Sequence, residues 1–234
     1  MNQALTIFRK EFRDYFISPV GYIVVCIFLL VTGWFFFTTF FLFSEANLRS
    51  FFNLLPLTFS LVIPAVTMKL FAEEIHTGSY EMLLTLPVTH NDVVAGKFLA
   101  SASFVAVMLA PTLFYAASVA FIGRLDWGPV LGGYLGAMLM GAAFSAIGVF
   151  ASSITRNQIV ACIVGMVICF GLTLFDKMVF FFPGKIVEVS TYLAAATHFE
   201  NISKGIIDTR DLLYFASVVF LFLYGSNVVM QARK

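Results

Sequence analysis

The sequence predicts an all-α polytopic membrane protein, a bundle of six transmembrane helices that follows an N-terminal amphipathic interfacial helix. Of its 234 residues 60% are hydrophobic and 12% are charged, and the mean hydropathy is +0.95. Soluble domains carry about 25% charged residues, so this chain has too few polar groups to cover a water-facing surface. Six apolar stretches each approach the roughly 20 residues that cross a bilayer core as a helix. We predict one transmembrane domain over residues 1–234.

The N-terminal segment, residues 1–18, has the pattern of an amphipathic helix. Apolar residues such as Phe8 and Phe12 recur at spacings of three and four, while Arg9 and Arg13 lie on the other face. This pattern is typical of a helix that lies in the membrane interface. A short cytoplasmic helix that folds onto a partner protein is the alternative, and both descriptions can hold.

The six apolar stretches are predicted to be the membrane spans. They cover residues 20–43, 52–71, 98–122, 129–154, 158–175 and 212–230. The second contains Pro56 and Pro64, which spans tolerate when neighbouring groups satisfy the freed carbonyls. The end of the fifth is ambiguous, because Asp176 and Lys177 are followed by further apolar residues.

Basic residues near the span ends predict the orientation. They are more frequent on the side of the N-terminus, above all when the long fifth connection is set aside. The positive-inside rule then places both termini in the cytoplasm. Two connections are long, residues 69–97 inside and 176–211 outside. Function tends to reside in connections held by a rigid scaffold, so these two are the candidate functional segments.

The inside connection contains a break and a short helix. Gly78 interrupts the helix that leaves the second span, and Ser79 is expected to cap a new one. Pro87 ends this short helix, and Asn91 or Asp92 is expected to begin the next. Apolar residues would hold the short helix at the membrane surface, where its acidic and hydroxyl groups suit docking of another protein. From the residues alone, an ordinary interfacial loop of the bundle is as well supported as a docking helix.

Residues in this connection are the candidates for docking. They are Glu73, Glu74, Gly78, Ser79, Glu81, Met82, Leu83, Leu86 and Pro87.

Small residues recur every four positions in the fourth span, at Gly133, Ala137 and Gly141. Such a stripe lets two helices approach closely. It is a candidate contact with a second subunit, and packing within one subunit explains it at least as well.

The sequence offers no catalytic, cofactor-binding or metal-ligating set. His76, His90 and His198 fall in connections on opposite sides, and each is expected to be a surface or capping residue. The middles of the spans contain no ionisable residues, which argues against a proton-coupled carrier and a membrane-embedded enzyme. The phosphate-binding pattern G-x-x-x-x-G-K-[ST] does not occur. A net charge of +1 gives no reason to expect nucleic acid.

The inside connection resembles the signature connection of ABC-2 type permeases. The residues that carry this resemblance are Glu73, Glu74, Thr77, Gly78, Ser79, Glu81, 83–88, Gly96 and Lys97. Residues 16–22, 154–158 and 198–208 are similar to other parts of the same family, so the resemblance covers nearly the whole chain. Within the family, the chain is most similar to the gliding-motility-associated permeases, whose relatives include permeases linked to copper-enzyme maturation.

The resemblance implies a permease subunit that is not itself an enzyme, in the bacterial cytoplasmic membrane. A separate ABC ATPase subunit would bind ATP and Mg²⁺ and rest against the N-terminal helix and the inside connection. A second copy, or a homologous permease, would complete the pathway. Glu73 and Glu74 would pair with Lys or Arg of the ATPase or of the N-terminal helix, such as Arg9 or Arg13. Exposed pairs contribute under about 1 kcal/mol, so the apolar patch would contribute more to docking.

A different class of function stays open, namely a non-transporting membrane anchor or scaffold in a motility, secretion or enzyme-maturation assembly. The outside connection has an apolar face of Ile186, Val189, Tyr192 and Leu193. It is expected to gate an exit, to form a lid, or to dock an extracytoplasmic or membrane-anchored auxiliary protein. The uncharged spans mildly favour a lipid-linked, hydrophobic or polypeptide cargo.

Overall fold

The computed structural model describes residues 3–43, 47–80, 88–123, 125–178, 192–206 and 208–232. Over these residues it contains helices and no strands. Six helices are long and apolar enough to cross a membrane. They are Pro19–Phe40, Arg49–Thr77, His90–Phe121, Trp127–Ile154, Gln158–Phe175 and Thr209–Gln231. The predicted all-α bundle with six spans is confirmed, and the prolines of the second span do not prevent it from being helical.

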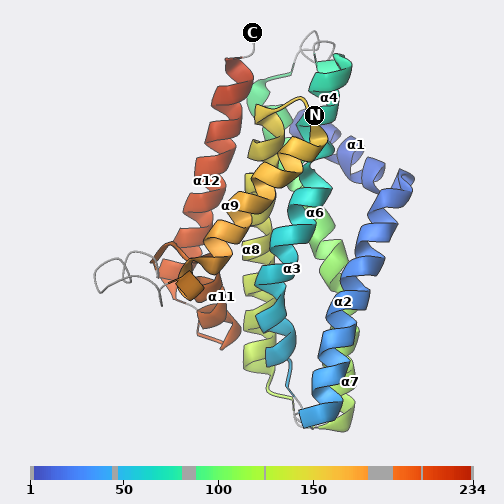
Figure 1. The fold of residues 1–234 in the computed structure, drawn as a ribbon, viewed down its shortest axis with the longest axis vertical. Helices are drawn as coiled ribbons and strands as arrows, with labels where there is room; N and C mark the ends of the chain where they lie inside the picture. The colour runs from blue at the N-terminus through green and yellow to red at the C-terminus, as the bar shows by residue number, and fades with distance from the viewer. Residues whose placement is uncertain are drawn as a thin grey trace.

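Helix α1 (Gln3–Ile17) lies across one end of the bundle, and α2 (Pro19–Phe43) turns away from it along the long axis (Figure 1). The break falls at Ser18, whose N–H donates to the Asp14 carbonyl at 3.2 Å. Pro19 then begins α2, because a first helical residue needs no N–H donor. Both chain ends lie on this side of the bundle, which is called the α1 end below.

The second span consists of α3 (Arg49–Thr67) and α4 (Lys69–Thr77), separated by a turn at Met68. Pro56 and Pro64 both lie inside α3, and the Met68 N–H still donates to the Pro64 carbonyl at 2.9 Å. Helix α4 ends at Gly78, whose φ of +73° is the left-handed conformation that favours glycine. The predicted interruption at Gly78 is therefore confirmed.

The third span begins with α6 (His90–Leu109) and continues through the 3₁₀ turn η1 (Ala110–Thr112), which contains Pro111, into α7 (Leu113–Ile122). Thr89 is the N-cap, and its hydroxyl accepts the Asp92 N–H at 3.2 Å. The Asp92 carboxylate accepts the Thr89 N–H at 3.3 Å. The expectation that Asn91 or Asp92 begins this helix is wrong by one or two residues, because the T-x-x-D capping box makes Thr89 the N-cap and His90 the first helical residue.

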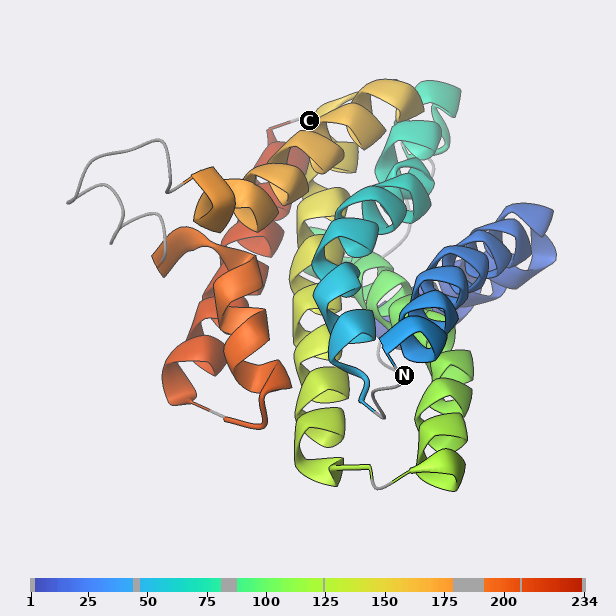
Figure 2. The ribbon, with the colours of Figure 1, turned by 60° about the horizontal axis from the view of Figure 1, so that its bottom comes forward.

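Helix α8 (Trp127–Ile154) is the centre of the bundle and contacts α3, α6, α9, α11 and α12 (Figure 2). The last three are α9 (Gln158–Met178), α11 (Ala195–Ser203) and α12 (Thr209–Gln231). In Figure 2, α11 and α12 lie on one side of α8, and α3 lies on the other.

The small-residue stripe of α8 packs inside the chain. A Cβ at Gly133 would lie 2.3 Å from the Phe52 ring of α3, and one at Gly141 would lie 2.6 Å from Val105 of α6. Ala137 between them is fully buried. The stripe therefore brings α3 and α6 close to α8, and it is not available as a contact with a second subunit.

Candidate functional site

The described part of residues 69–97, the predicted inside connection, includes Glu73, Glu74, Gly78 and Ser79. Glu73 is exposed on α4, and Glu74 is mostly buried. The Ser79 hydroxyl turns back onto the end of α4, where it lies 2.9 Å from Thr77 Oγ1 and donates to the Glu74 carbonyl at 3.4 Å. Ser79 therefore completes the end of α4. Five further candidates lie outside the described residues, namely Glu81, Met82, Leu83, Leu86 and Pro87.

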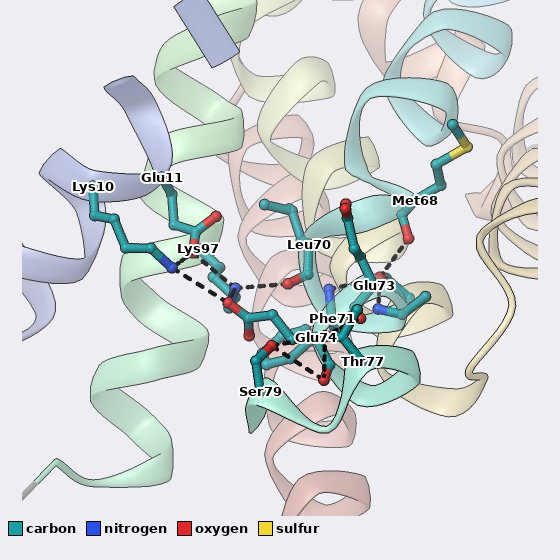
Figure 3. Close-up of polar contacts among 12 residues, drawn as sticks. Lys10, Glu11, Met68, Leu70, Phe71, Glu73, Glu74, Thr77, Ser79 and Lys97 are labelled. Carbon is teal, nitrogen blue, oxygen red and sulfur yellow. Dashed lines mark hydrogen bonds and ion pairs between the residues drawn. The ribbon is translucent and has the colours of Figure 1, made fainter. Parts of the chain in front are cut away.

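A buried lysine joins three helices at the α1 end (Figure 3). Lys97 of α6 is fully buried, and its Nζ lies 2.9 Å from Glu11 Oε1 of α1 and 2.9 Å from Glu74 Oε1 of α4. The same Nζ donates to the Leu70 carbonyl at 2.6 Å. The position of α1 is thereby fixed relative to the turns of the second and third spans at the α1 end.

Charge balance explains how Lys97 can be buried. Lys10 Nζ lies 3.3 Å from Glu11 Oε1 and 3.5 Å from Glu74 Oε1, so two ammonium groups face two carboxylates. The Lys97 ammonium also lies 5.1 Å from the centre of the Phe71 ring. An unpaired buried charge would be strongly unfavourable, whereas a paired and hydrogen-bonded one is tolerated. We call Lys10, Glu11, Glu74 and Lys97 the ion cluster.

The ion cluster shifts the pKa values of Lys10 and Glu11, its two residues on α1. Burial alone would raise the pKa of the Glu11 carboxyl, but the charge and hydrogen bond of Lys97, with a smaller effect of Lys10, hold that pKa below its usual value. Partial burial tends to lower the pKa of Lys10, and the carboxylates of Glu11 and Glu74 outweigh this and raise it. Glu11 and Lys10 are therefore charged at neutral pH.

The neighbouring glycine allows α1 to reach Lys97. A Cβ at Gly96 would lie 2.9 Å from the Ala4 carbonyl oxygen and 2.9 Å from the Ile7 Cβ of α1. Any larger residue would push α1 away from α6. The Gly96–Lys97 pair thus supplies close approach at one position and a central cation at the next.

Glu74 pairs with a basic residue of the N-terminal helix, as expected, but this residue is Lys10, at 3.5 Å, and not Arg9 or Arg13. Arg9 and Arg13 are exposed, on the face of α1 opposite to buried Glu11. Glu74 also pairs with Lys97.

The aromatic residues of α1 lie beside its buried face. Phe8 and Phe12 are half-buried, and their rings stack with centroids 5.7 Å apart. The N-terminal helix therefore packs with its buried face on α6 and presents arginines outward.

A serine of α8 holds the start of α4. Ser152 Oγ accepts the N–H groups of Phe71 and Ala72 at 2.9 and 3.0 Å, and it donates to the Met68 carbonyl at 2.8 Å. These backbone groups belong to the turn where α3 passes into α4. Ser152 is fully buried, so it replaces water for groups that the helix itself does not satisfy.

We expect Ser152→Ala to lower the free energy of unfolding by about 2 kcal/mol or more, because each buried group left unsatisfied costs about 1–3 kcal/mol. Ser153→Ala is the matched control, since Ser153 is also buried but donates only to the Phe150 carbonyl of its own helix. Thermal unfolding of the purified chain in detergent measures both variants. Equal midpoints for the two would contradict the role of Ser152.

The other end of the bundle contains a second buried polar group. His198 of α11 is buried, its Nδ1 lies 2.6 Å from Asp211 Oδ1 of α12, and its Nε2 lies 3.1 Å from the Tyr192 carbonyl oxygen. The His198 ring stacks on Tyr214 at 4.1 Å. The prediction that His198 is a surface or capping residue is wrong, because α11 folds back against α8 and α12.

The other histidines lie elsewhere. His76 is exposed at the end of α4, and His90 Nδ1 lies 3.2 Å from the Tyr80 hydroxyl. On the predicted outside face, Tyr192 and Leu193 are exposed, and Ile186 and Val189 lie outside the described residues.

The fold and the ion cluster together define a multi-pass membrane protein whose N-terminal helix is joined to two of its spans by buried charges. The sequence matches the profile of the family described as ABC-2 family transporter protein over residues 5–230. The chain belongs to this family, and it is the permease component of an ABC transporter. No curated protein matches it.

Proposed function

We propose that this permease moves a substrate across the bacterial cytoplasmic membrane with energy from a separate ATPase, which docks at the α1 end. Both termini would then be cytoplasmic, and ATP and Mg²⁺ would be bound by the ATPase. The ion cluster is the observation that carries the proposal. It makes a surface helix and the inner turns of two spans into one connected unit.

Force applied at the α1 end would reach the spans through buried contacts. Lys97 connects α1 and α4 to α6, and Ser152 connects the start of α4 to α8. A push on α1 or α4 therefore moves the second, third and fourth spans together. Packed side chains and hydrogen-bond networks of this kind are able to carry coupling between distant sites.

The surface above the ion cluster suits a polar partner. A recess of about 490 Å³ lies between α1 and α4, and its walls include Asp14, Lys69, Glu73 and Thr77. Arg9 and Arg13 lie exposed on the outward face of α1. Ion pairs here would be exposed and individually weak, so we propose that the apolar residues around Leu83 supply most of the docking energy.

A second copy of the chain, or a homologous permease, would complete the pathway, because six spans are half of the usual unit in this family. The scaffold alternative requires no coupling to ATP hydrolysis. The two functions are separated by whether the chain changes the turnover of its ATPase.

We expect Leu83→Asp to abolish coupled ATP hydrolysis while the chain still inserts into the membrane, because a charge would disrupt the apolar docking patch. The measurement is ATP turnover by an ABC ATPase from the same genome, reconstituted with the chain in vesicles. Ile206→Asp is the control, since Ile206 is exposed between α11 and α12 and does not belong to the apolar face of residues 186–193. Wild-type turnover in Leu83→Asp would refute the docking role. A wild-type chain without effect on any such ATPase would favour the scaffold.

A further inference from the structure

An apolar groove runs along the bundle between α6, α8 and α12, away from the ion cluster. Its cavity volume is about 570 Å³. Val94 and Phe98 of α6 form one wall, Leu139 and Ala142 of α8 form the floor, and α12 forms the other wall. All three helices are membrane spans, so the groove opens toward the bilayer.

The length of the groove matches one leaflet. Its α12 wall extends from Phe215 to Asn227, which covers about 18 Å at 1.5 Å per residue. Half of the hydrocarbon core of a bilayer is about 15 Å thick.

The width of the groove suits a single hydrocarbon chain. Dividing the volume by this length gives a mean cross-section of about 30 Å². The groove is therefore at least wide enough for one hydrocarbon chain.

The groove is continuous with the lipid-facing surface of α12. Phe220 and Tyr224 form its outer lip, and both are more than half exposed. Leu213, Leu221 and Val228 of the same helix are also exposed. An apolar surface of a spanning helix is in contact with acyl chains, and an acyl chain is the occupant that can leave this surface and enter the groove without exposing a polar group.

Two amides close the groove at the α1 end. The Asn227 Nδ2 donates to Asn91 Oδ1 between α12 and α6. An amide nitrogen carries two N–H donors and this bond uses one, so a donor remains for an ester or phosphate oxygen. In the sequence, Arg233 and Lys234 follow α12, which favours an anionic headgroup.

We propose that this groove binds one acyl chain of a phospholipid, from the leaflet at the α1 end, with the headgroup near Asn91 and Asn227. The bound chain would fill the space between α6 and α12, which pack more closely on α8 than on each other. The groove would bind lipid whether or not the chain couples to an ATPase.

The test uses the full chain in vesicles of phosphatidylethanolamine and phosphatidylglycerol that contain a phosphatidylglycerol with a photoactivatable acyl chain. Ala142→Phe would fill the groove from its floor on α8, and Ala216→Phe would fill it from its wall on α12. Ala120→Phe is the matched control, because Ala120 is exposed on α7 outside the groove. After illumination, mass spectrometry maps the labelled peptides, and native mass spectrometry counts the phospholipids retained in detergent.

We expect labelling of α6 and α12 peptides in the wild type, and about tenfold less retained phospholipid in both groove variants, the effect of roughly 1.4 kcal/mol of binding. Ala120→Phe should match the wild type. Unchanged labelling in correctly folded groove variants would overturn the proposal. So would a change from dimer to monomer in the groove variants without loss of lipid, because a second copy would then occupy the groove.

Discussion

Replacement of Lys97 with methionine is expected to lower the free energy of unfolding by about 3–5 kcal/mol, the effect of removing one partner from a buried ion pair. The substitution keeps most of the side-chain volume, so the loss comes from charge. Glu11 and Glu74 would stay mostly buried at the junction of α1, α4 and α6, with only the half-exposed Lys10 near them. The unfolding midpoint of the purified chain in detergent measures the loss.

Lys204→Met is the matched control for this variant. Lys204 Nζ lies 2.8 Å from Glu200 Oε1, at a pair whose side chains are about half exposed, and such pairs contribute under about 1 kcal/mol. Glu11→Gln in the Lys97→Met background should restore part of the stability, because it removes a carboxylate that has lost its cation. Proteolysis at Arg9 and Arg13 should increase in Lys97→Met if α1 detaches. Equal stability of Lys97→Met and Lys204→Met would refute the role of the ion cluster.

The spans could be predicted from the sequence because length and hydropathy alone decide them. Each predicted stretch overlaps one observed span, and most ends differ by only a few residues. The larger differences are at the end of the second span and the start of the third, because α4 and α6 continue beyond the apolar stretches of the sequence. Gly78 could be predicted to end a helix because its signal is local. The prediction of Asn91 or Asp92 as the start of the third-span helix misses the T-x-x-D capping box, which makes Thr89 the N-cap and His90 the first helical residue.

The ion cluster could not be predicted, because its partners are far apart in the chain. Lys97 lies 86 positions from Glu11 in the sequence. From the sequence alone, a lysine next to the end of a span is expected to lie in the membrane interface. Whether Glu11 or Arg9 faces α6 depends on how α1 rotates when it packs against Gly96. The small-residue stripe of α8 is equally ambiguous. Small residues indicate that another helix packs closely, but they do not indicate which helix it is. The Phe52 ring against Gly133 settles this in favour of packing within the chain.

Replacement of His198 with alanine is expected to lower the free energy of unfolding by about 3 kcal/mol and to loosen residues 192–206. Asp211 is buried at the start of α12, and His198 is the group that its Oδ1 contacts. A carbonyl only accepts, so His198 Nε2 must donate to Tyr192. Alanine removes both contacts of the His198 ring, the one with Asp211 Oδ1 and the one with the Tyr192 carbonyl oxygen.

Hydrogen exchange of the 192–206 peptides separates this local effect from general instability. His76→Ala is the matched control, because His76 is exposed at the end of α4 and its removal should leave exchange unchanged. Asp211→Asn in the His198→Ala background should recover part of the stability, since an amide without a partner is less unfavourable when buried than a carboxylate. Exchange in His198→Ala that matches His76→Ala would mean that packing against the neighbouring helices holds α11 without the His198–Asp211 contact, above all at Gly132 of α8, where a Cβ would lie 2.3 Å from the Ile202 carbonyl oxygen. Faster exchange confined to 192–206 would instead show that the His198–Asp211 contact fixes this segment on α12.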